Sequence, residues 1–288
     1  MVLRVSNCSP HPSGQLRLED FAALRVSGED RVDFLQGQLS QDMGGVTPAQ
    51  AAPAAWCNRQ GRVLCLMVAV DWQDAIFLIL PAGMAQTCAD GLGRYILRAK
   101  VRIERWDQAP GSEDGTLSAP GVFGCAGIEA LGAEAWACKV DEAYCAVRLP
   151  GTGDRALLLG EPPTNVEGAP GSGWTLEDWR LADLEAELPW IHEETSGKFL
   201  AHSLNLDLSG AVSFTKGCYV GQEIIARMEH RGRPKRRMRR LRLPPGVDIR
   251  NGARAQHPEL GAIMVIGAAR AGEETEVLAE VRLAQDLT

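Results

Sequence analysis

The most distinctive stretch of this chain is Lys-Gly-Cys-Tyr-Val-Gly-Gln-Glu at residues 216–223. An apolar run follows at residues 224–226, so we expect a helix to begin where the octapeptide ends. A helix start gathers unpaired N–H groups and a partial positive charge, and Lys216 adds a cation. Both features stabilise a thiolate, so we predict that Cys218 is a reactive thiol. The alternative is a tight turn in which Cys218 is a small buried hydrophobe.

Shorter blocks on both sides of the octapeptide extend the pattern over most of the chain. They lie at residues 26–30, 34–38, 58–63, 179–180, 188–189, 199–200, 205–207, 226–227, 231–232 and 235–237. Together with the octapeptide they resemble the YgfZ/GcvT-like folate-binding family, the bacterial relatives of the mitochondrial iron–sulfur assembly factors. The resemblance implies an aminomethyltransferase-like fold, a three-lobed plate with tetrahydrofolate or a derivative in a central channel.

Length and composition are those of a folded protein of about two domains. The chain has 288 residues, of which 45% are hydrophobic and 23% are charged. No apolar run reaches the ~18 residues that a membrane helix needs, and residues 1–13 lack the pattern of a signal peptide. We therefore expect a cytoplasmic protein without a membrane partner.

The cysteines and histidines do not have the spacing of a metal site. The eight cysteines, at positions 8, 57, 65, 88, 125, 138, 145 and 218, include no C-x2-C or C-x4-C pair. His192, His202 and His257 have no acidic or thiol neighbours at ligand spacing along the sequence. We expect no bound metal.

The order of the predicted elements indicates an α+β fold. Strands at residues 21–26, 54–57, 62–70, 76–80 and 101–106 alternate with a helix after residue 30 and another at 84–98. A second unit of similar type follows, and a linker rich in Pro, Gly and Ser comes near residues 162–173. Past Pro234, short strands separated by turns predict a small barrel. We therefore expect a folate-binding region of two ferredoxin-like α+β units at 1–232 and a C-terminal β-barrel at 233–288.

Two segments have the pattern of elements that are buried on both faces. The run at residues 63–70 is apolar throughout, which is typical of a central strand covered on two sides. Thr175 and Asp178 have the spacing of a capping box at the start of a helix. The apolar residues of that helix project to two opposite sides, so we expect it to lie between two layers.

The resemblance also implies aromatic contacts to the folate. Phe21 and Trp179 occupy the positions where the bacterial family places tryptophans beside this ligand. Phe21 departs from that pattern, because its ring can stack but lacks the indole N–H. The alternative for Trp179 is a core tryptophan packed between domains on small alanines.

Further candidate contacts lie in the octapeptide and the predicted helix after it. Gln222 and Glu223 are expected at the amide edge of the pterin, and Arg227 at a folate carboxylate. Lys216 and Tyr219 complete the predicted cofactor-binding set, since a folate site needs cations and aromatic faces as well as amide partners.

The leading functional interpretation rests on the resemblance. It is a tetrahydrofolate-binding accessory protein that supports assembly or repair of iron–sulfur clusters in other enzymes, including tRNA-modifying enzymes. Its expected partners are folate and iron–sulfur client or assembly proteins, and Cys218 is its expected reactive group.

Two alternatives belong to other classes. The first is a folate-dependent aminomethyltransferase or demethylase, but the strand at residues 61–67 lacks the acid on which aminomethyl transfer in the related enzymes depends. The second is an RNA-binding module that uses residues 227–242, where nine Lys/Arg residues accompany one acid. A half-exposed strand explains the same basic segment without RNA.

Overall fold

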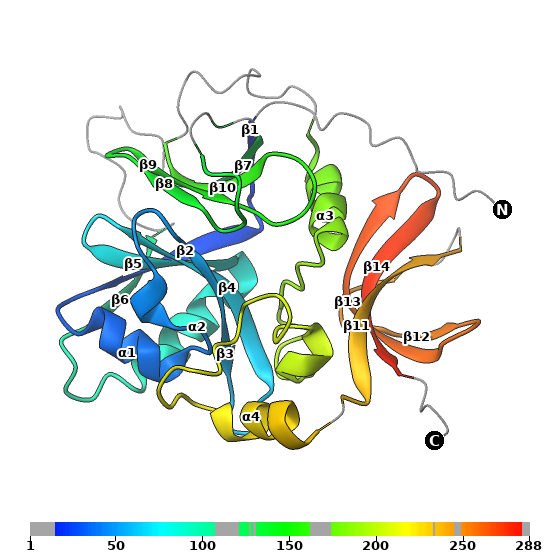
Figure 1. Cartoon of the computed structure of the whole chain (residues 1–288). Coiled ribbons are helices and arrows are strands. Elements are labelled where there is room, and N and C mark those ends of the chain that lie inside the picture. Colours follow the sequence, from blue (N-terminus) through cyan, green and yellow to red (C-terminus); the bar gives the residue numbers. More distant parts are fainter. Residues whose placement is uncertain are drawn as a thin grey trace.

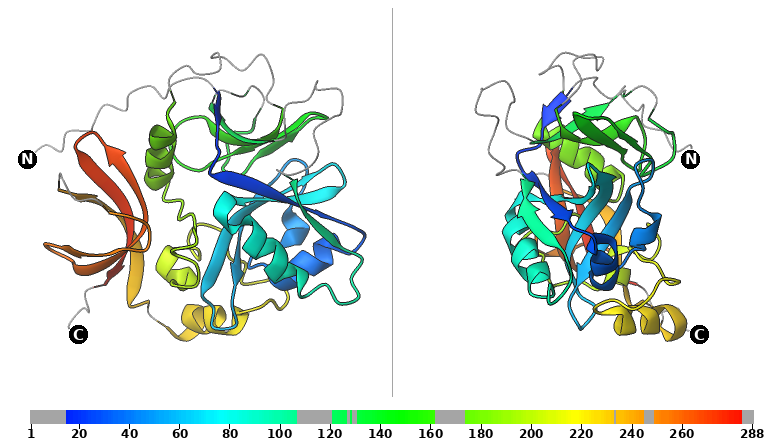
Figure 2. Two further views of the ribbon diagram at one scale, coloured as in Figure 1. Left: turned by 180° about the vertical axis from the view of Figure 1, so that it is seen from behind. Right: turned by 90° about the vertical axis from the view of Figure 1, so that its left-hand side faces the viewer.

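The computed structural model describes residues 15–106, 121–126, 128, 131–161, 174–232, 234–244 and 249–283. Their strands form three antiparallel sheets that lie in three lobes (Figure 1). The molecule is narrower after a quarter turn about the vertical axis, so the lobes form a plate (Figure 2). The predicted linker at 162–173 lies outside the described residues. No described helix is both long and apolar enough to cross a membrane.

The first lobe is a ferredoxin-like unit, as predicted. Its elements in chain order are β2 (Phe21–Ser27), α1 (Arg31–Gln38), η1 (Met43–Gly45), β3 (Ala52–Cys57), β4 (Val63–Trp72), β5 (Ala75–Pro81), η2 (Ala82–Met84), α2 (Ala85–Gly93) and β6 (Arg102–Arg105). The strands pair in the order β3-β4-β5-β2-β6. β2, α1, β4, β5, α2 and β6 follow the βαββαβ order of the motif, and β3 extends one edge of the sheet.

The second lobe departs from the predicted ferredoxin-like unit. Its strands are β1 (Gln15–Arg17), β7 (Gly121–Ala126), β8 (Cys138–Val140), β9 (Tyr144–Arg148) and β10 (Arg155–Gly160). They pair in the order β1-β7-β10-β9-β8, so the edge beside β7 comes from a strand that precedes the first lobe. The described residues between β7 and β8 form turns and bends.

The third lobe is a four-stranded sheet of β11 (Arg236–Leu243), β12 (Arg254–His257), β13 (Gly261–Ala271) and β14 (Glu274–Arg282). The strands pair in the order β11-β14-β13-β12. Within the described residues no pairing joins the edge strands β11 and β12, so the predicted closure into a barrel is not confirmed. Before this lobe the chain forms α3 (Leu176–Glu185), η4 (Ala201–Leu204) and α4 (Gln222–Arg231).

The sheet of the first lobe is covered on both faces. On β4, Cys65 and Met67 pack into a core shared with α1 and α2. Val68 and Val70, which point to the opposite face, pack into a second core with residues of β9 and β10. The prediction of a central strand covered on two sides is therefore confirmed.

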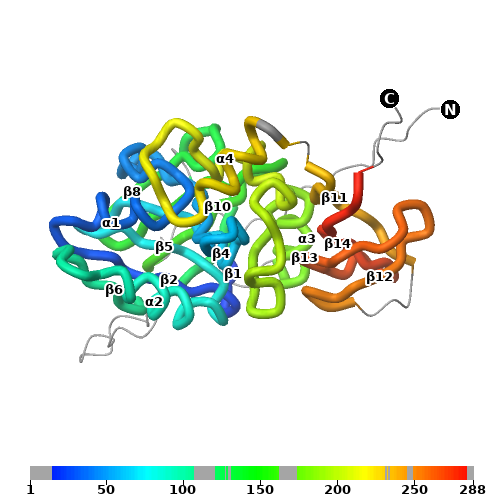
Figure 3. The backbone as a smooth tube through the Cα atoms, turned by 90° about the horizontal axis from the view of Figure 1, so that it is seen from below, coloured from blue at the N-terminus to red at the C-terminus, as the bar shows by residue number. Residues whose placement is uncertain are grey.

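Helix α3 begins at the predicted residue and lies between two lobes. Thr175 Oγ1 accepts a hydrogen bond from the Asp178 N–H at 3.1 Å, and the Asp178 carboxylate accepts one from the Thr175 N–H at 2.9 Å, so the capping box is confirmed. Trp179 packs into the core shared by the first two lobes, and Leu184 into a core that includes β13 and β14. The helix thus separates the third lobe from the rest of the plate (Figure 3).

Substitutions at two helical glycines test how closely α2 packs on the sheet of the first lobe. A methyl group at Gly91 would collide with the Trp56 ring of β3, whereas one at Gly37 in α1 would meet nothing within 4 Å. We expect Gly91→Ala to lower the free energy of unfolding by about 1–3 kcal/mol through overpacking. Gly37→Ala is the matched control and should raise it by up to about 1 kcal/mol, the helix-propensity gain. Urea unfolding measures both, and a Gly91→Ala variant as stable as wild type would contradict this packing.

Candidate functional site

The octapeptide is held against the β3–β4 hairpin. The predicted helix is present, but α4 begins at Gln222, inside the octapeptide rather than after it. Gly221 precedes it with φ +86°, in the left-handed region that favours glycine. A side chain at Gly221 would collide with the carbonyl oxygen of Asn58 in the hairpin. One at Gly61, also with positive φ, would come within 2.9 Å of Ile224 Cβ. The two glycines therefore allow the hairpin and the start of α4 to touch.

Lys216 is buried and points to the C-terminal end of α1. Its ammonium donates hydrogen bonds to the carbonyl oxygens of Gln36 at 2.7 Å, Leu39 at 2.8 Å and Gln41 at 2.7 Å. Burial lowers the pKa of Lys216 to about 8, and Asp42 opposes that shift. All three N–H donors are engaged within the protein. In this conformation Lys216 has no donor left for a folate carboxylate or for the Cys218 sulfur.

Cys218 is accessible. Of the seven cysteines that the structure describes it is the exposed one. It lines a shallow pocket of about 570 Å³ with Arg59, Tyr95, Ala226 and residues 219–223, which we call the motif pocket. The accessibility that the reactive-thiol prediction requires is present, and the reactivity itself remains a prediction.

The other octapeptide residues line or flank the same pocket. Tyr219 is buried and its ring lies 5.1 Å from the Lys216 ammonium, and burial raises the pKa of its phenol. Arg227 Nη2 donates to Glu223 Oε1 at 2.6 Å, one helical turn away on the exposed side of α4. Arg227 is thus paired within its own helix, while Glu223 and Gln222 face the motif pocket.

A second concavity lies between α3, the segment after it and the third lobe. This central cleft has a volume of about 570 Å³, within the range of small-molecule sites. Phe21 lines it, and its ring meets the Trp190 ring edge to face at 4.9 Å. The remaining wall is formed chiefly by Asp20, Arg180, Asp183, Leu184, Leu188, His192, Glu194, residues 249–251 and residues 267–268.

Two carboxylates of the central cleft have contrasting surroundings. Asp20 Oδ2 accepts hydrogen bonds from Arg180 at 3.0 and 3.2 Å, while its Oδ1 is buried without a partner among the described residues. Asp183 is buried and accepts from Arg155 Nη1 at 2.8 Å and from Trp190 Nε1 at 2.9 Å. Burial raises the pKa of Asp183, and the Arg155 charge opposes that shift. For the nearby His192, whose charged form is the protonated one, burial instead lowers the pKa.

Trp179 is not part of the wall of the central cleft. It is 2% exposed, and its ring lies 4.7 Å from the buried Arg155 guanidinium and 5.6 Å from the Trp174 ring. The indole packs directly on the backbone of Gly124 in β7, so any side chain at position 124 would collide with it. The ring therefore packs like a core residue, but its indole N–H is buried without a partner among the described residues, so its predicted contact with folate stays a prediction. Trp190 is the tryptophan that lines the central cleft.

Five of the predicted site residues line one of two separate concavities. Phe21 belongs to the central cleft, whereas Cys218, Tyr219, Gln222 and Glu223 belong to the motif pocket. Figure 1 shows α4 along the lower edge of the plate and α3 higher, between the second and third lobes.

Several cleft residues were missed by the sequence analysis. They are Asp20, Asp183, Trp190 and His192. The available signal was Asp183, an acid between Ala182 and Leu184 in a helix predicted to be covered on both sides. A charge in such a position requires a buried partner, and Arg155 supplies it.

The basic segment is mostly neutralised by ion pairs. On β11, Arg236 pairs with Glu280, Arg240 with Glu185 and Glu276, and Arg242 with Glu274 and Glu276. Arg237 binds both carboxylate oxygens of Asp207, at 2.6 and 2.8 Å. The β11 part of the segment is therefore a half-exposed strand in which four of the five arginines are paired, in line with the explanation without RNA; Arg239 forms no ion pair among the described residues.

A third concavity carries unpaired cations. This basic pocket has a volume of about 720 Å³ and is lined in part by Arg62, Lys198, Arg236, Arg254 and Glu280. Arg236 pairs with Glu280. Within the described part of the chain, Arg62, Lys198 and Arg254 form no ion pair with a carboxylate.

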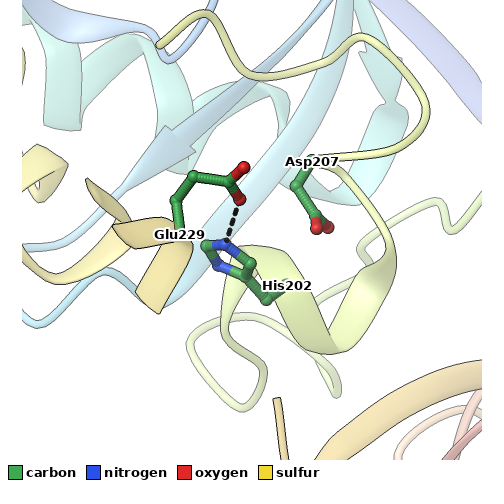
Figure 4. A group of neighbouring side chains, drawn as sticks. All are labelled: His202, Asp207 and Glu229. Carbon is green, nitrogen blue, oxygen red and sulfur yellow. Dashed lines mark hydrogen bonds and ion pairs between the residues drawn. The ribbon is translucent and has the colours of Figure 1, made fainter. Parts of the chain in front are cut away.

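His202 has acidic neighbours in space that its sequence neighbourhood did not indicate. Asp207 and Glu229 approach it from the loop after η4 and from α4, and His202 Nε2 lies 3.4 Å from Glu229 Oε2 (Figure 4). This corrects the expectation that His202 lacks such neighbours. Because the Arg237 guanidinium already occupies both oxygens of Asp207, a cation here would have to compete with it.

No family model matches the chain. Three curated relatives are named tRNA-modifying protein YgfZ. Those of Edwardsiella ictaluri and Klebsiella pneumoniae are each 30% identical, over 245 residues (80% of this chain, 71% of the relative) and 240 residues (78% and 70%). That of Colwellia psychrerythraea is 26% identical over 233 residues (77% and 69%).

Among solved structures, the glycine cleavage system aminomethyltransferase T of Bartonella henselae has a TM-score of 0.65 to this chain. The match covers 95% of this chain and 79% of that one at 14% identity. At this identity the match establishes a shared fold, in agreement with the predicted aminomethyltransferase-like architecture.

We expect Cys218 to be the first described cysteine to react with an alkylating reagent in the native protein. It is exposed near the start of a helix, whereas the other six are buried or half-buried. Mass-spectrometric labelling with iodoacetamide between about pH 5 and 9 measures the order. Cys218→Ser should change the free energy of unfolding by less than about 0.5 kcal/mol, as for other surface sites. Labelling of Cys218 after the buried cysteines would contradict the reactive-thiol prediction.

Proposed function

Because this chain belongs to the YgfZ family, which its relatives' names link to tRNA modification, we propose that it is a tetrahydrofolate-binding accessory protein. It supports the assembly or repair of iron–sulfur clusters in other enzymes, with tRNA-modifying enzymes among them. The proposal has two parts, a folate site in the central cleft and a protein-facing thiol in the motif pocket.

The observation that carries the folate site is the unpartnered Oδ1 of Asp20 beside the Phe21 and Trp190 rings. A buried acceptor without a donor costs about 1–3 kcal/mol, which a ligand donor can recover. A reduced pterin presents amide and amino N–H groups along one edge of a flat ring. The Asp20 carboxylate can accept hydrogen bonds from that N–H edge, and the Phe21 and Trp190 rings can pack against the faces of the pterin.

The basic pocket offers a place for the anionic end of the same ligand. Strand β13 borders both concavities, with Gly267 at the central cleft and Met264 at the basic pocket. Three residues of strand separate them by roughly 10 Å. We propose that Arg62, Lys198 and Arg254 attract the glutamate carboxylates of the folate tail.

Aminomethyl transfer is not part of the proposal. Cys65 and Leu66 of β4 are buried apolar residues where the related enzymes place an acid. The cleft carboxylates Asp20 and Asp183 are each ion-paired with an arginine, so neither is a free base for proton transfer at a folate nitrogen.

The motif pocket is the proposed contact with client or assembly proteins. Cys218 lies there beside the exposed Tyr95 ring, on a part of the surface separate from the central cleft. RNA binding is not favoured, because four of the five β11 arginines that would form a basic track are paired with acids of α3, β14 and the loop after η4.

Tetrahydrofolate binding tests the first part. Asp20→Ala and Trp190→Ala should each weaken binding by about 1–3 kcal/mol, the scale of one lost polar partner or one large buried side chain. Isothermal titration calorimetry measures the affinities, and circular dichroism checks the fold of each variant. Tyr95→Ala in the motif pocket is the matched control and should bind as wild type does. Equal affinity in all four proteins would move the folate site away from the cleft.

The same titration with a polyglutamylated folate tests the basic pocket. The added carboxylates should strengthen binding to wild type, and Arg254→Ala should remove that gain while leaving the affinity for the monoglutamate form unchanged. A gain that persists in Arg254→Ala and in Lys198→Ala would separate the tail from this pocket.

Cluster-dependent enzyme activity tests the second part. In cells that lack the protein, Cys218→Ser should restore less activity of iron–sulfur tRNA-modifying enzymes than wild type, because serine keeps the size but lacks the soft nucleophile. Abundance of the variant, measured by immunoblotting, is the control. Full restoration by Cys218→Ser at equal abundance would remove the thiol from the mechanism.

A further inference from the structure

Two cysteines outside both sites face each other across neighbouring strands. Cys138 on β8 and Cys145 on β9 have their Sγ atoms 3.3 Å apart. Cys138 pairs with Val147 and Cys145 with Val140, so the cysteines are diagonal neighbours in the ladder. Residues two apart on a strand share a face, and all four side chains pack into the same apolar cluster.

We propose that Cys138 and Cys145 are an oxidisable dithiol that a peroxide converts into an intramolecular disulfide. This modification site is independent of the proposed folate and client functions. Cys138 is half-buried and therefore meets the oxidant, whereas Cys145 is fully buried and lies behind it.

The chemistry needs one peroxide for each pair. The Cys138 thiolate attacks one peroxide oxygen, the O–O bond breaks, and a sulfenic acid and a water form once the leaving hydroxide takes a proton. The Cys145 sulfur then attacks the Cys138 sulfur and expels a second water. Two thiols are oxidised by two electrons and the peroxide is reduced to two waters. Cys145 fits the second step, because its sulfur lies 3.3 Å from that of Cys138 and its burial keeps it away from the oxidant in solution.

The ladder geometry makes the disulfide easy to reduce again. Diagonal partners in an antiparallel pair have Cα atoms about 7–8 Å apart, beyond the ~4.4–6.8 Å of a relaxed disulfide. Forming the bond therefore requires β8 to shift toward β9. β8 is a three-residue edge strand and can move, but the bond keeps some strain. Strained disulfides are the labile and reversible ones.

The movement of β8 toward β9 would alter hydrogen bonds at the junction of the first two lobes. The Cys138 N–H donates to the Ala49 carbonyl oxygen at 2.9 Å, and the Ala51 N–H donates to that of Trp136 at 2.9 Å. Moving β8 toward β9 stretches these hydrogen bonds. Oxidation of the pair therefore loosens the contact between the second lobe and residues 47–51 of the first.

The chain contains an internal control. Cys65 on β4 and Cys88 on α2 are also close enough for Cys88 to raise the pKa of Cys65, but both are fully buried in the core of the first lobe. If proximity alone decided oxidation, this pair would react as well. If access of the oxidant to one member is required, it stays reduced.

The test is a hydrogen peroxide titration of the native protein, followed by acid quench, alkylation of the remaining thiols and mass spectrometry without reduction. Wild type should yield a Cys138–Cys145 cross-link, formed at least roughly tenfold faster than any loss of the Cys65 and Cys88 thiols, and reversed by dithiothreitol. Cys145→Ser should accumulate a dimedone-reactive sulfenic acid at Cys138. Cys138→Ser should leave Cys145 reduced.

A second readout does not depend on the variants. Amide hydrogen exchange at Ala51 and Cys138 should accelerate in the peroxide-treated wild type and return after reduction. The proposal is overturned if Cys138 and Cys145 remain thiols while Cys218 is oxidised, or if the Cys65–Cys88 pair cross-links as readily. Cross-linking without any change in exchange would overturn the effect on the lobe junction.

Discussion

Burial of the first lobe's sheet on both faces is the constraint on which the rest of the molecule depends. Its own helices cover one face, and the other is left as a broad apolar surface that includes Val68, Val70 and Phe77. Such a surface cannot remain in water, so the second sheet must pack on it. Trp179 then extends this shared core into α3, and Leu184 on the other side of the helix extends a further core into the third lobe.

A buried polar network runs through the same junction. Arg155 of β10 donates to the Ala182 carbonyl oxygen at 3.0 Å and to the Asp183 carboxylate, and Asp183 in turn holds the Trp190 indole N–H. Removing an arginine and a carboxylate from water is costly, so such a pair contributes more to a unique arrangement than to stability. Here the second lobe fixes the orientation of the Trp190 ring that faces the central cleft.

Local patterns explain which parts of the fold were predictable. The two-sided strand β4 and the capping box of α3 depend on neighbouring residues, and both were predicted correctly. A helix after the octapeptide was also predicted, although α4 begins slightly earlier, at Gln222. The second lobe was less predictable, because its edge strand β1 comes from before the first lobe and no local pattern announces that pairing.

The site was harder to predict than the fold, because side-chain direction depends on how lobes pack. The sequence contains Phe21, Trp179 and the octapeptide as equal candidates, yet packing turns Trp179 into the core and gives the cleft wall to Trp190. The ion pairs of β11 have the same origin. Their partners, such as Glu185 and Glu276, come from other elements, so most of the positive charge of this strand is paired in a way that the sequence did not indicate.

The position of β1 has a consequence for how the chain reaches this structure. Gln15 pairs with Cys125, so the whole first lobe is synthesised before the partner strand of β1 exists. Contacts between residues so distant in sequence are slow to form, because the intervening chain must first be ordered. During synthesis the first lobe can fold early, because all of its strands are already present. Until β7 is made, the backbone groups of β1 have no strand to pair with. Pairing of β1 with β7 is then a late folding step. Because β1 leads directly into the first lobe, this pairing joins the two lobes so that they unfold as one cooperative unit.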